Sequence, residues 1–593
     1  MNEKMTDKRY NHPRPQFMRK KWQDLAGQWQ FAFDDHNLGV KEEWFKGLNT
    51  TQEITVPYTY ETKLSGIHDT THHQVVWYQK EFEIESVKEF SLVFEGVDYF
   101  AQIWLNGQHI GSHMGAYERF TFEVKDYLLS GTNKLVVRVE DSLACEQPRG
   151  KQRWLKDNFG CWYVQTTGIW KTVWLEEHLA SQSLELVKLT PDLDRDKIIL
   201  VPKLRDQLKE FGNQYHFEVK IYFADQLINT YKGLLNHDLT PIELDTRVKE
   251  DACWGTKEWS PETPNLYDIT FCLYDLAGNL LDEVESYFGM RKIAIENGQI
   301  LLNNRQLYQR LILDQGYWAE SGLTPPSVDA LEVDIDRIFE MGYNGLRKHQ
   351  KIEDERFLYL CDKKGMLVWS EMAATYTFND AAAQKITTEW QKIIEQNYNH
   401  PSIITWVPFN ESWGIKDIAY DKQQQAFTEG IYHLTKAYDA MRPVITNDGW
   451  VHTISDIITL HDYEEFGELF TQRYQDKDKI LNNEIQFNKD FHAFAQGYSY
   501  KGQPVIISEF GGIAFTTTDK DEWGYGHQVQ DESAFIERFD KIHAAIQNLD
   551  YIVGFCYTQL TDVEQEVNGL LDVQRKAKVD LTAVAKINRR RLK

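Results

Sequence analysis

Two glutamates follow short apolar segments at the points where buried strands are expected to end. Glu411 comes after residues 403–407 and Asn410, and Glu509 comes after residues 505–507. Segments that are apolar on both faces are typical of strands inside a parallel sheet. Two carboxyl groups placed at the carboxyl ends of such strands can hydrolyse a glycosidic bond. We therefore consider Glu411 and Glu509 a candidate catalytic pair; the alternative is that each is a solvated residue or a helix cap.

The secondary structure that must position this pair is expected to differ between the N-terminal and C-terminal halves of the 593 residues. Short alternating segments separated by turns, among them a hairpin signal at Asn106-Gly107, predict a jelly-roll β-sandwich over residues 1–180. Further alternating segments predict an immunoglobulin-like β-sandwich over residues 181–292. From residue 293 strands alternate with amphipathic helices, which predicts a (β/α)8 TIM barrel over residues 293–593.

Eight strands are expected in the barrel, at residues 307–313, 345–347, 366–369, 403–407, 444–446, 457–460, 505–507 and 553–556. Helices are expected between them, for example at residues 327–341 and 386–398. On this count Glu411 ends the fourth strand and Glu509 ends the seventh.

Charge and composition exclude several classes of function. The net charge is −25, and the one basic run, residues 589–591, cannot supply the positive surface that nucleic acid requires. No run of ~18 apolar residues occurs, and residues 1–30 lack the apolar core of a signal peptide. Six cysteines without CxxC spacing are typical of reduced thiols. We expect a cytoplasmic protein that binds neither nucleic acid nor membranes.

Aromatic residues make up 13% of the chain, with 18 Trp. Flat rings can stack on sugars, although most of these side chains should fill cores. Residues 141–167 form a long tryptophan-containing connection between two expected strands, and such loops are usually functional or disordered. Either it reaches an active site in another domain, or it packs the domains together.

The chain resembles glycoside hydrolase family 2, which contains β-galactosidases, β-glucuronidases and β-mannosidases. The resemblance covers essentially the whole chain. Its most specific parts are Phe-Asn-Glu-Ser-Trp-Gly around Glu411, Ser-Glu-Phe-Gly-Gly around Glu509, and the closing segment 560–570.

The resemblance implies that Glu411 is the general acid/base and Glu509 the nucleophile, in a double displacement with retention of configuration. One carboxyl must be protonated to assist the leaving oxygen and the other must be ionised to attack. Their carboxyl groups should lie roughly 5 to 5.5 Å apart.

Three supporting residues follow from the resemblance. Asn410 should donate a hydrogen bond to the sugar 2-hydroxyl. Arg347 should keep Glu509 ionised, and Tyr463 resembles the family's tyrosine that bonds the nucleophile. The alternatives are a structural ion pair for Arg347 and a packed loop aromatic for Tyr463. Weaker candidates for lining the pocket are His349, Glu371, Trp413, Asn447, Trp450 and Trp523.

The chain departs from the family pattern at two places. After the first strand it carries residues 313–318 instead of a histidine-rich segment, so we expect Asp314 and Trp318 to replace the usual sugar contacts. Where β-glucuronidases have an Asn-x-Lys pair, Glu566 to Asn568 stand here. A glutamate would repel a uronate, which disfavours glucuronidase activity. Glu371 matches one magnesium-ligand position of the large galactosidases, but no companion ligands are found, so no metal and no cofactor are predicted.

The sequence therefore predicts a retaining exo-β-glycosidase for neutral terminal sugars, with β-galactosides first. The same mechanism on a β-glucuronide, a β-mannoside or an α-L-arabinopyranoside is the alternative. A non-catalytic carbohydrate-binding protein is the alternative from another class. The expected partner is a carbohydrate, and a homo-oligomer is consistent with the resemblance.

Overall fold

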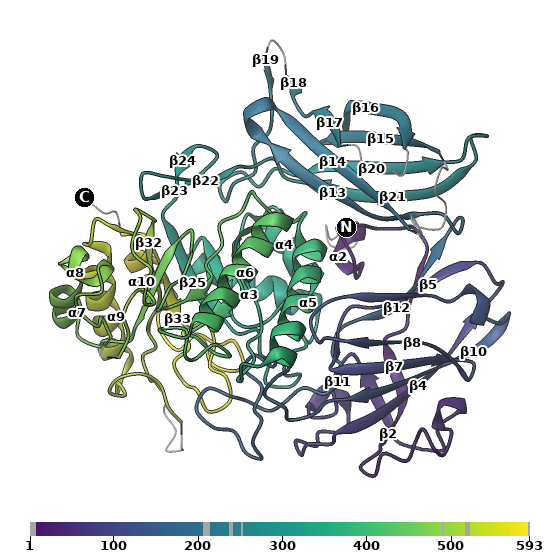
Figure 1. Ribbon diagram of the computed structural model, residues 1–593, viewed down its shortest axis with the longest axis horizontal. Helices are drawn as coiled ribbons and strands as arrows, with labels where there is room; N and C mark the ends of the chain where they lie inside the picture. The colour runs from purple at the N-terminus through teal and green to yellow at the C-terminus, as the bar shows by residue number, and fades with distance from the viewer. Residues whose placement is uncertain are drawn as a thin grey trace.

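The computed structural model describes residues 7–205, 214–235, 241–250, 253–488, 490–515 and 522–590. The first six residues of the expected jelly roll, the side chain of Cys253 and Arg591 lie outside this part. Figure 1 shows a barrel on the left, one β-sandwich at its lower right and a second β-sandwich above. The short N-terminal helix α2 (Lys8–Asn11) lies between the two sandwiches.

The first sandwich packs a six-stranded sheet, in the order β3-β2-β4-β10-β7-β8, against a four-stranded sheet, β1-β12-β5-β9. Its strands are β1 (Trp22–Asp24), β2 (Gly27–Phe33), β3 (Glu53–Val56), β4 (Val75–Ile84), β5 (Glu89–Phe94), β6 (Val97–Asp98), β7 (Phe100–Leu105), β8 (Gln108–Met114), β9 (Phe120–Glu123), β10 (Gly131–Glu140), β11 (Gly168–Ile169) and β12 (Val173–His178). Asn106 and Gly107 both have positive φ, 53° and 79°, as the predicted two-residue hairpin turn requires.

The second sandwich pairs a three-stranded sheet, β13-β14-β17, with a four-stranded sheet, β16-β15-β20-β21, around one apolar core. Its strands are β13 (Leu184–Asp192), β14 (Lys197–Leu204), β15 (Tyr215–Phe223), β16 (Gln226–Leu235), β17 (Ile242–Asp245), β18 (Val248–Glu250), β19 (Cys253–Gly255), β20 (Tyr267–Tyr274) and β21 (Leu280–Phe288). The strand pairs in both of its sheets are antiparallel. The immunoglobulin-like topology stays a prediction.

A three-stranded antiparallel sheet then leads into the barrel, formed by β22 (Ile293–Glu296), β23 (Gln299–Leu302) and β24 (Arg305–Gln306). Its apolar residues Ile300 and Leu302 belong to one buried cluster with Trp369 and Ile506 of the barrel strands. This sheet therefore closes the amino-terminal end of the barrel.

Seven parallel strands of the barrel form one sheet in the order β28-β27-β26-β25-β33-β32-β31. They are β25 (Gln309–Asp314), β26 (Gly345–Lys348), β27 (Leu367–Glu371), β28 (Ile403–Val407), β31 (Ile458–Asp462), β32 (Val505–Gly511) and β33 (Ile552–Thr558). Each is buried along its length, with Arg310 alone half-buried. The strands therefore occupy the positions that the apolar segments predicted.

The expected fifth strand is shorter than predicted. Residues 444–446 make a single bridge, Val444 to Trp406, and the pairing continues between β29 (Phe409–Asn410) and β30 (Asn447–Asp448). The Thr446 hydroxyl donates to the carbonyl of Ile454. Local side-chain bonds of this kind compete with ladder pairing.

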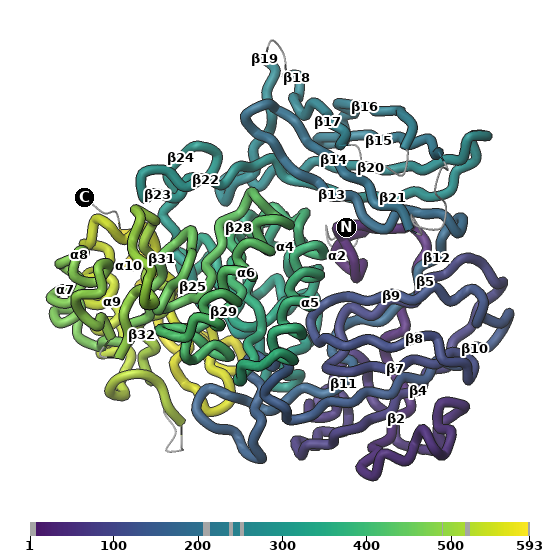
Figure 2. The backbone as a smooth tube through the Cα atoms, in the orientation of Figure 1, coloured from purple at the N-terminus to yellow at the C-terminus, as the bar shows by residue number. Residues whose placement is uncertain are grey.

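The helices are α3 (Val328–Glu340), α4 (Glu355–Lys364), α5 (Asp380–Asn397), α6 (Lys422–Tyr438), α7 (Gly467–Tyr474), α8 (Lys477–Leu481), α9 (Glu532–Gln547) and α10 (Leu581–Asn588). Helix α3 lies where a helix was expected at 327–341, and Ser327 caps it by accepting a hydrogen bond from the Ala330 amide. Helix α5 begins six residues before the predicted start, because Asn379 accepts a hydrogen bond from the Ala382 amide and caps the helix there. Figure 2 shows these helices grouped around the strands.

Within the described residues no helix is both long enough and apolar enough to cross a membrane. The five cysteines whose side chains are described, Cys145, Cys161, Cys272, Cys361 and Cys556, form no disulfide.

Candidate active site

Arg347 in β26 is fully buried and joins three carboxylates. Its Nη1 donates to Glu509 Oε1 at 2.6 Å. Its Nε lies 2.5 Å from Glu371 Oε2 and 2.9 Å from Asp448 Oδ2. Its Nη2 donates to Asn410 Oδ1 at 2.6 Å. Arg347 thus contacts both Asn410 and Glu509 at the carboxyl ends of the barrel strands.

Glu509 is surrounded by groups that favour its ionised form. Tyr463 donates its hydroxyl to Glu509 Oε2, and His461 Nδ1 lies 3.6 Å from the same oxygen. Burial raises the pKa of Glu509, but the positive charges of His461 and Arg347 outweigh it and lower the pKa to about 2. Glu509 is therefore ionised at neutral pH, which its predicted role as nucleophile requires.

Glu411 lies beside Glu509, with His461 between them. His461 Nδ1 is 2.8 Å from Glu411 Oε1, and oxygens of the two glutamates lie within 4.8 Å of each other. Retaining glycosidases keep their carboxyl groups ≈ 5–5.5 Å apart, and inverting enzymes need 6.5–9.5 Å. The side chain of Glu411 is 19% exposed, so it can reach a ligand.

A tight turn aims Glu411 into the site. Glu411 and Ser412 have φ of 49° and 60°, a backbone region that is uncommon outside glycine. The Glu411 amide donates to the Asp448 carbonyl at 2.8 Å, and the Ser412 amide donates to Asn447 Oδ1 at 2.9 Å. Asn447 also donates to the carbonyl of Trp450 at 2.7 Å. Asn447 thus positions the turn that carries Glu411.

A cavity of about 460 Å³ opens in front of these groups, a size suited to a small ligand. It is lined by Glu411, Trp450, His461, Asp462, Tyr463, Glu464, Glu465, Arg473, Asn488, Tyr525 and Gly526. Tyr463 stacks on Tyr525 with ring centroids 3.4 Å apart. Trp450 stacks on Phe491 at 4.0 Å. A larger cleft of about 840 Å³ is lined in part by residues 497–503, and neither Glu411 nor Glu509 lines it.

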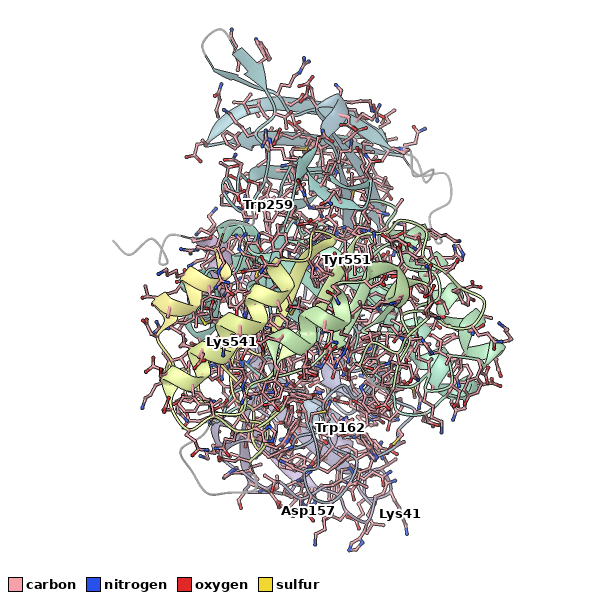
Figure 3. The ribbon with its side chains drawn as sticks, turned by 90° about the vertical axis from the view of Figure 1, so that its left-hand side faces the viewer. Lys41, Asp157, Trp162, Trp259, Lys541 and Tyr551 are labelled. Atoms are coloured by element: carbon pink, nitrogen blue, oxygen red, sulfur yellow. The ribbon has the colours of Figure 1, made fainter. Side chains whose placement is uncertain are left out.

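Residues 141–167 reach this end of the barrel. The amides of Arg149 and Gly150 donate to the carbonyl of Ala374 at 2.9 and 3.1 Å. Trp162 meets Trp413 edge to face at 5.2 Å. Figure 1 shows this blue segment beside the yellow C-terminal loops, and Figure 3 places Trp162 and Trp259 toward opposite ends of the barrel.

Trp413 and Trp523 both contact the loop 141–167 from the barrel side. Trp523 donates from Nε1 to the carbonyl of Gly160 at 2.9 Å. Asn158 donates to Glu564 in the closing segment. Both tryptophans therefore hold the loop of the first sandwich against the barrel, and direct sugar contacts by either remain a prediction.

His349 and Glu371 form the layer behind Arg347. His349 Nδ1 lies 3.1 Å from Arg347 Nη2 and 2.9 Å from Glu371 Oε1. Burial lowers the pKa of His349, and the charge of Arg347 lowers it further. Burial raises the pKa of Glu371 to about 7, although the charge of Arg347 lowers it in part. These contacts pair Glu371 with Arg347 and His349, and the absence of a metal stays a prediction.

Asp314 and Trp318 differ from their expected places. Asp314 is buried and its carboxylate lies 2.5 Å from Lys348 Nζ, so it supports the site through an ion pair, and a direct sugar contact stays a prediction. Trp318 lies under Arg575, whose guanidinium carbon is 3.7 Å from its ring centroid. It lines a separate depression with Asp334. The expectation that Trp318 contacts the same sugar as Glu411 is therefore wrong.

Glu411, His461 and Glu509 have ligand atoms close enough together to hold a metal ion. His461, however, faces Glu411 with Nδ1 and lies 3.3 Å from Asp448 Oδ2 with Nε2. Burial lowers the pKa of His461, but Glu509 and Asp448 raise it to about 10. A protonated imidazole has no lone pair for a metal, so this arrangement fits an internal cation better than a metal site.

Two central residues were not identified from the sequence, His461 and Asp448. His461 directly precedes the strand-end residues Asp462 and Tyr463, so its place at a strand terminus was the available signal. Asp448 ends the short strand β30. Burial raises its pKa, but Arg347 and His461 hold it well below the ordinary value.

Three family models match consecutive parts of the chain. They are "Glycosyl hydrolases family 2, sugar binding domain" over residues 22–178, "Glycosyl hydrolases family 2" over residues 184–291 and "Glycosyl hydrolases family 2, TIM barrel domain" over residues 293–589. The chain belongs to glycoside hydrolase family 2. The predicted family and the predicted fold class, N-terminal β domains followed by a TIM barrel, are confirmed.

Curated relatives are distant. A β-galactosidase of Thermoanaerobacter pseudethanolicus is 24% identical over 535 residues, covering 86% of this chain and 67% of that protein. A β-galactosidase of Leuconostoc mesenteroides is 25% identical over 532 residues, covering 82% of this chain and 47% of that protein. The chain thus spans about half the length of several relatives that it matches.

Solved structures match over nearly the full length. A β-galacturonidase from Eisenbergiella tayi has 21% identity and a TM-score of 0.74, covering 97% of both chains. A β-glucuronidase from Ruminococcus gnavus has 18% identity and a TM-score of 0.77, covering 96% of this chain and 98% of that one. At this identity the likeness establishes the shared fold.

Proposed function

We propose that this protein is a retaining exo-β-glycosidase that releases neutral terminal sugars, with β-galactosides as the first expected substrate. The observation that carries the proposal is the close pair of Glu411 and Glu509, with Arg347 and His461 lowering the pKa of Glu509 to about 2. A binding protein has no need of an ionised carboxylate held by two cations. Family membership and the cavity in front of the pair support the same conclusion.

In the first step Glu509 attacks the anomeric carbon, the bond to the leaving oxygen breaks, and Glu411 gives its proton to that oxygen. The product is a glycosyl ester on Glu509. In the second step Glu411 takes a proton from water as the water attacks the same carbon. The sugar leaves with its original configuration, and both glutamates return to their starting states. We expect Asn410, whose Oδ1 accepts from Arg347 at 2.6 Å, to bind the sugar 2-hydroxyl with its amide nitrogen.

Glu566 favours a neutral sugar over a uronate. It is buried, it accepts hydrogen bonds from the Tyr163 hydroxyl and from Asn568 Nδ2, the latter at 2.9 Å, and its negative charge acts on Cys161 and Tyr525 of the site. A substrate carboxylate here would meet this charge. A β-glucuronide, a β-mannoside or an α-L-arabinopyranoside remains the alternative substrate. The cytoplasmic location and the homo-oligomer stay predictions.

The test is hydrolysis of p-nitrophenyl glycosides: β-galactoside, β-glucuronide, β-mannoside, β-glucoside and α-L-arabinopyranoside. Wild type, Glu509→Gln and the exposed control Glu468→Gln are compared. We expect release from a neutral glycoside by wild type and control, with kcat at least 10³-fold lower in Glu509→Gln, and proton NMR should show the β-anomer as first product. Sugar binding without release from any substrate, or unchanged activity in Glu509→Gln, would overturn the proposal and favour a carbohydrate-binding protein.

A further inference from the structure

Lys151 is a buried lysine in the long connection between β10 and β11, 9% exposed. Among the described residues no carboxylate lies within 4 Å of its ammonium group, and no oxygen accepts a hydrogen bond from it. Its partners are the thiol of Cys161 and the ring of Trp162, whose centroid is 5.9 Å away. An ammonium group has three donors. Burial lowers the pKa of Lys151, but the charges of Cys161 and Glu566 outweigh burial and raise the pKa, so the group stays charged. The group therefore has donors available for a ligand.

The backbone holds Lys151 at the mouth of the barrel. Its carbonyl accepts from the Tyr163 amide at 2.8 Å. The preceding Gly150 has φ +62°, and a Cβ there would lie 2.6 Å from the carbonyl of Gln350. A glycine at this point allows the close approach of the loop to the barrel, and Lys151 follows directly.

Electrostatic contacts link Lys151 to the site. After burial and Arg347, the charge of Lys151 is the next largest cause that lowers the pKa of His349. Cys161, the partner of Lys151, in turn interacts with the charge of Glu411. The charge of Lys151 thus acts on His349, which lies beside Arg347, the residue that holds Glu509.

We propose that Lys151 is a specificity-determining residue, whose ammonium group donates a hydrogen bond to a hydroxyl of the terminal sugar. This inference rests on the proposed glycosidase function and deepens it. It gives the first sandwich a direct part in choosing the sugar.

The charges of the site favour a hydroxyl over a carboxylate as the acceptor. Arg347 and His461 are already paired with carboxylates of the barrel, Arg347 with Glu371, Asp448 and Glu509 and His461 with Glu411 and Asp448. The charge of Glu566 acts on Lys151 at longer range. A substrate carboxylate at Lys151 would also lie in the field of Glu566, whereas a hydroxyl accepts from Lys151 without adding a negative charge.

The test compares wild type, Lys151→Met and Lys151→Arg with Lys156→Met, an exposed lysine in the same loop. Substrates are the p-nitrophenyl β-galactoside, its 3-deoxy, 4-deoxy and 6-deoxy analogues, and the β-galacturonide. Loss of one hydrogen bond to a charged donor predicts that Lys151→Met lowers kcat/KM for the galactoside about 10- to 100-fold. For one deoxy analogue the variant and wild type should be equal, because the hydroxyl that Lys151 binds is absent. Tm should stay within 2 °C of wild type or rise, since methionine removes a buried charge.

Several results would overturn the inference. Equal losses on every analogue in Lys151→Met would show a structural role, and a loss below threefold would show no role. Preference of wild type for the galacturonide, abolished in Lys151→Met, would assign Lys151 to a carboxylate instead. Failure of the proposed function is distinct, because wild type and Lys156→Met would then release nothing from any substrate.

Discussion

His461 Nδ1 lies 2.8 Å from Glu411 Oε1 and 3.6 Å from Glu509 Oε2, so that a single imidazole faces both proposed catalytic carboxylates. Its other nitrogen lies 3.3 Å from Asp448 Oδ2. Burial opposes the charged form of His461, but the surrounding carboxylates outweigh it and raise its pKa to about 10. The site therefore contains a second fixed cation besides Arg347.

Replacement of this cation should move the pH dependence of the reaction. In His461→Gln, Glu509 keeps Arg347 but loses the larger of the two charges that lower its pKa to about 2. The pKa of Glu509 should rise, so the acidic limb of kcat/KM should move up by roughly 1–2 pH units. The measurement is a pH profile between 3 and 8, with the exposed His433→Gln as control. An unmoved acidic limb with normal folding would show that His461 does not act on Glu509.

The same histidine should make stability depend on pH. Its pKa is raised from 6.5 to about 10 in the folded protein. A raised pKa contributes stability that is fully present below about pH 6.5 and is lost as pH rises through about 10. Wild type should exceed His461→Gln by on the order of 4 kcal/mol in free energy of unfolding at pH 6.

Urea unfolding at pH 6, 8 and 10 tests this expectation. The difference in free energy of unfolding between wild type and His461→Gln should become smaller as the pH rises. A constant gap would mean that the histidine stabilises by packing alone.

Tyr463 should act through its hydroxyl. The hydroxyl donates to Glu509 Oε2, while the ring stacks on Tyr525 at 3.4 Å. Tyr463→Phe keeps the stack and removes a hydrogen bond to a charged group, so we expect kcat about 10- to 100-fold lower with Tm within 2 °C of wild type. Steady-state kinetics and thermal melts measure both, with the exposed Tyr420→Phe as control. A large fall in Tm would indicate a packing role.

The barrel strands could be predicted because burial on both faces leaves an apolar signal in the sequence. The exception is 444–446, where Val444 makes a single bridge and the pairing continues only at Asn447 and Asp448. Strand ends and family motifs predicted the common location of five site residues, whose roles stay predictions: Glu411, Glu509, Asn410, Arg347 and Tyr463.

His461 and Trp318 show where the sequence was insufficient. His461 acquires its role from carboxylates 13 to 50 positions away, which spacing alone does not reveal. Trp318 was assigned to the sugar because it follows the first strand, but Arg575 from the other end of the barrel domain covers its ring at 3.7 Å. The role of His461 and the surroundings of Trp318 both depend on contacts between segments that are far apart in the sequence.

Proton donation by Glu411 should matter most for glycosides whose leaving group departs poorly without a proton. In Glu411→Ala a 2,4-dinitrophenyl glycoside should still form the glycosyl-enzyme, because this phenolate leaves without a proton, whereas hydrolysis of a natural-type glycoside should fall about 10²- to 10⁴-fold. Azide should restore turnover by entering the space of the lost carboxylate and give the β-glycosyl azide. In Glu509→Ala azide should instead give the α-azide. Products of the same configuration from both variants, identified by NMR, would contradict the assigned roles.

Docking of the loop 141–167 should depend on Gly150. A side chain there would place Cβ 2.6 Å from the carbonyl of Gln350 at φ +62°, so Gly150→Ala must push the loop off the barrel. We expect kcat/KM to fall at least tenfold, because Lys151 and Trp162 move with the loop, and limited proteolysis to cut within residues 141–167. Gly430→Ala is the matched control: it lies in α6 with no atom within 4 Å of the added Cβ and should stabilise by roughly 0.5–1 kcal/mol without loss of activity. Normal kinetics in Gly150→Ala together with the new cleavage would show that the barrel acts without this loop.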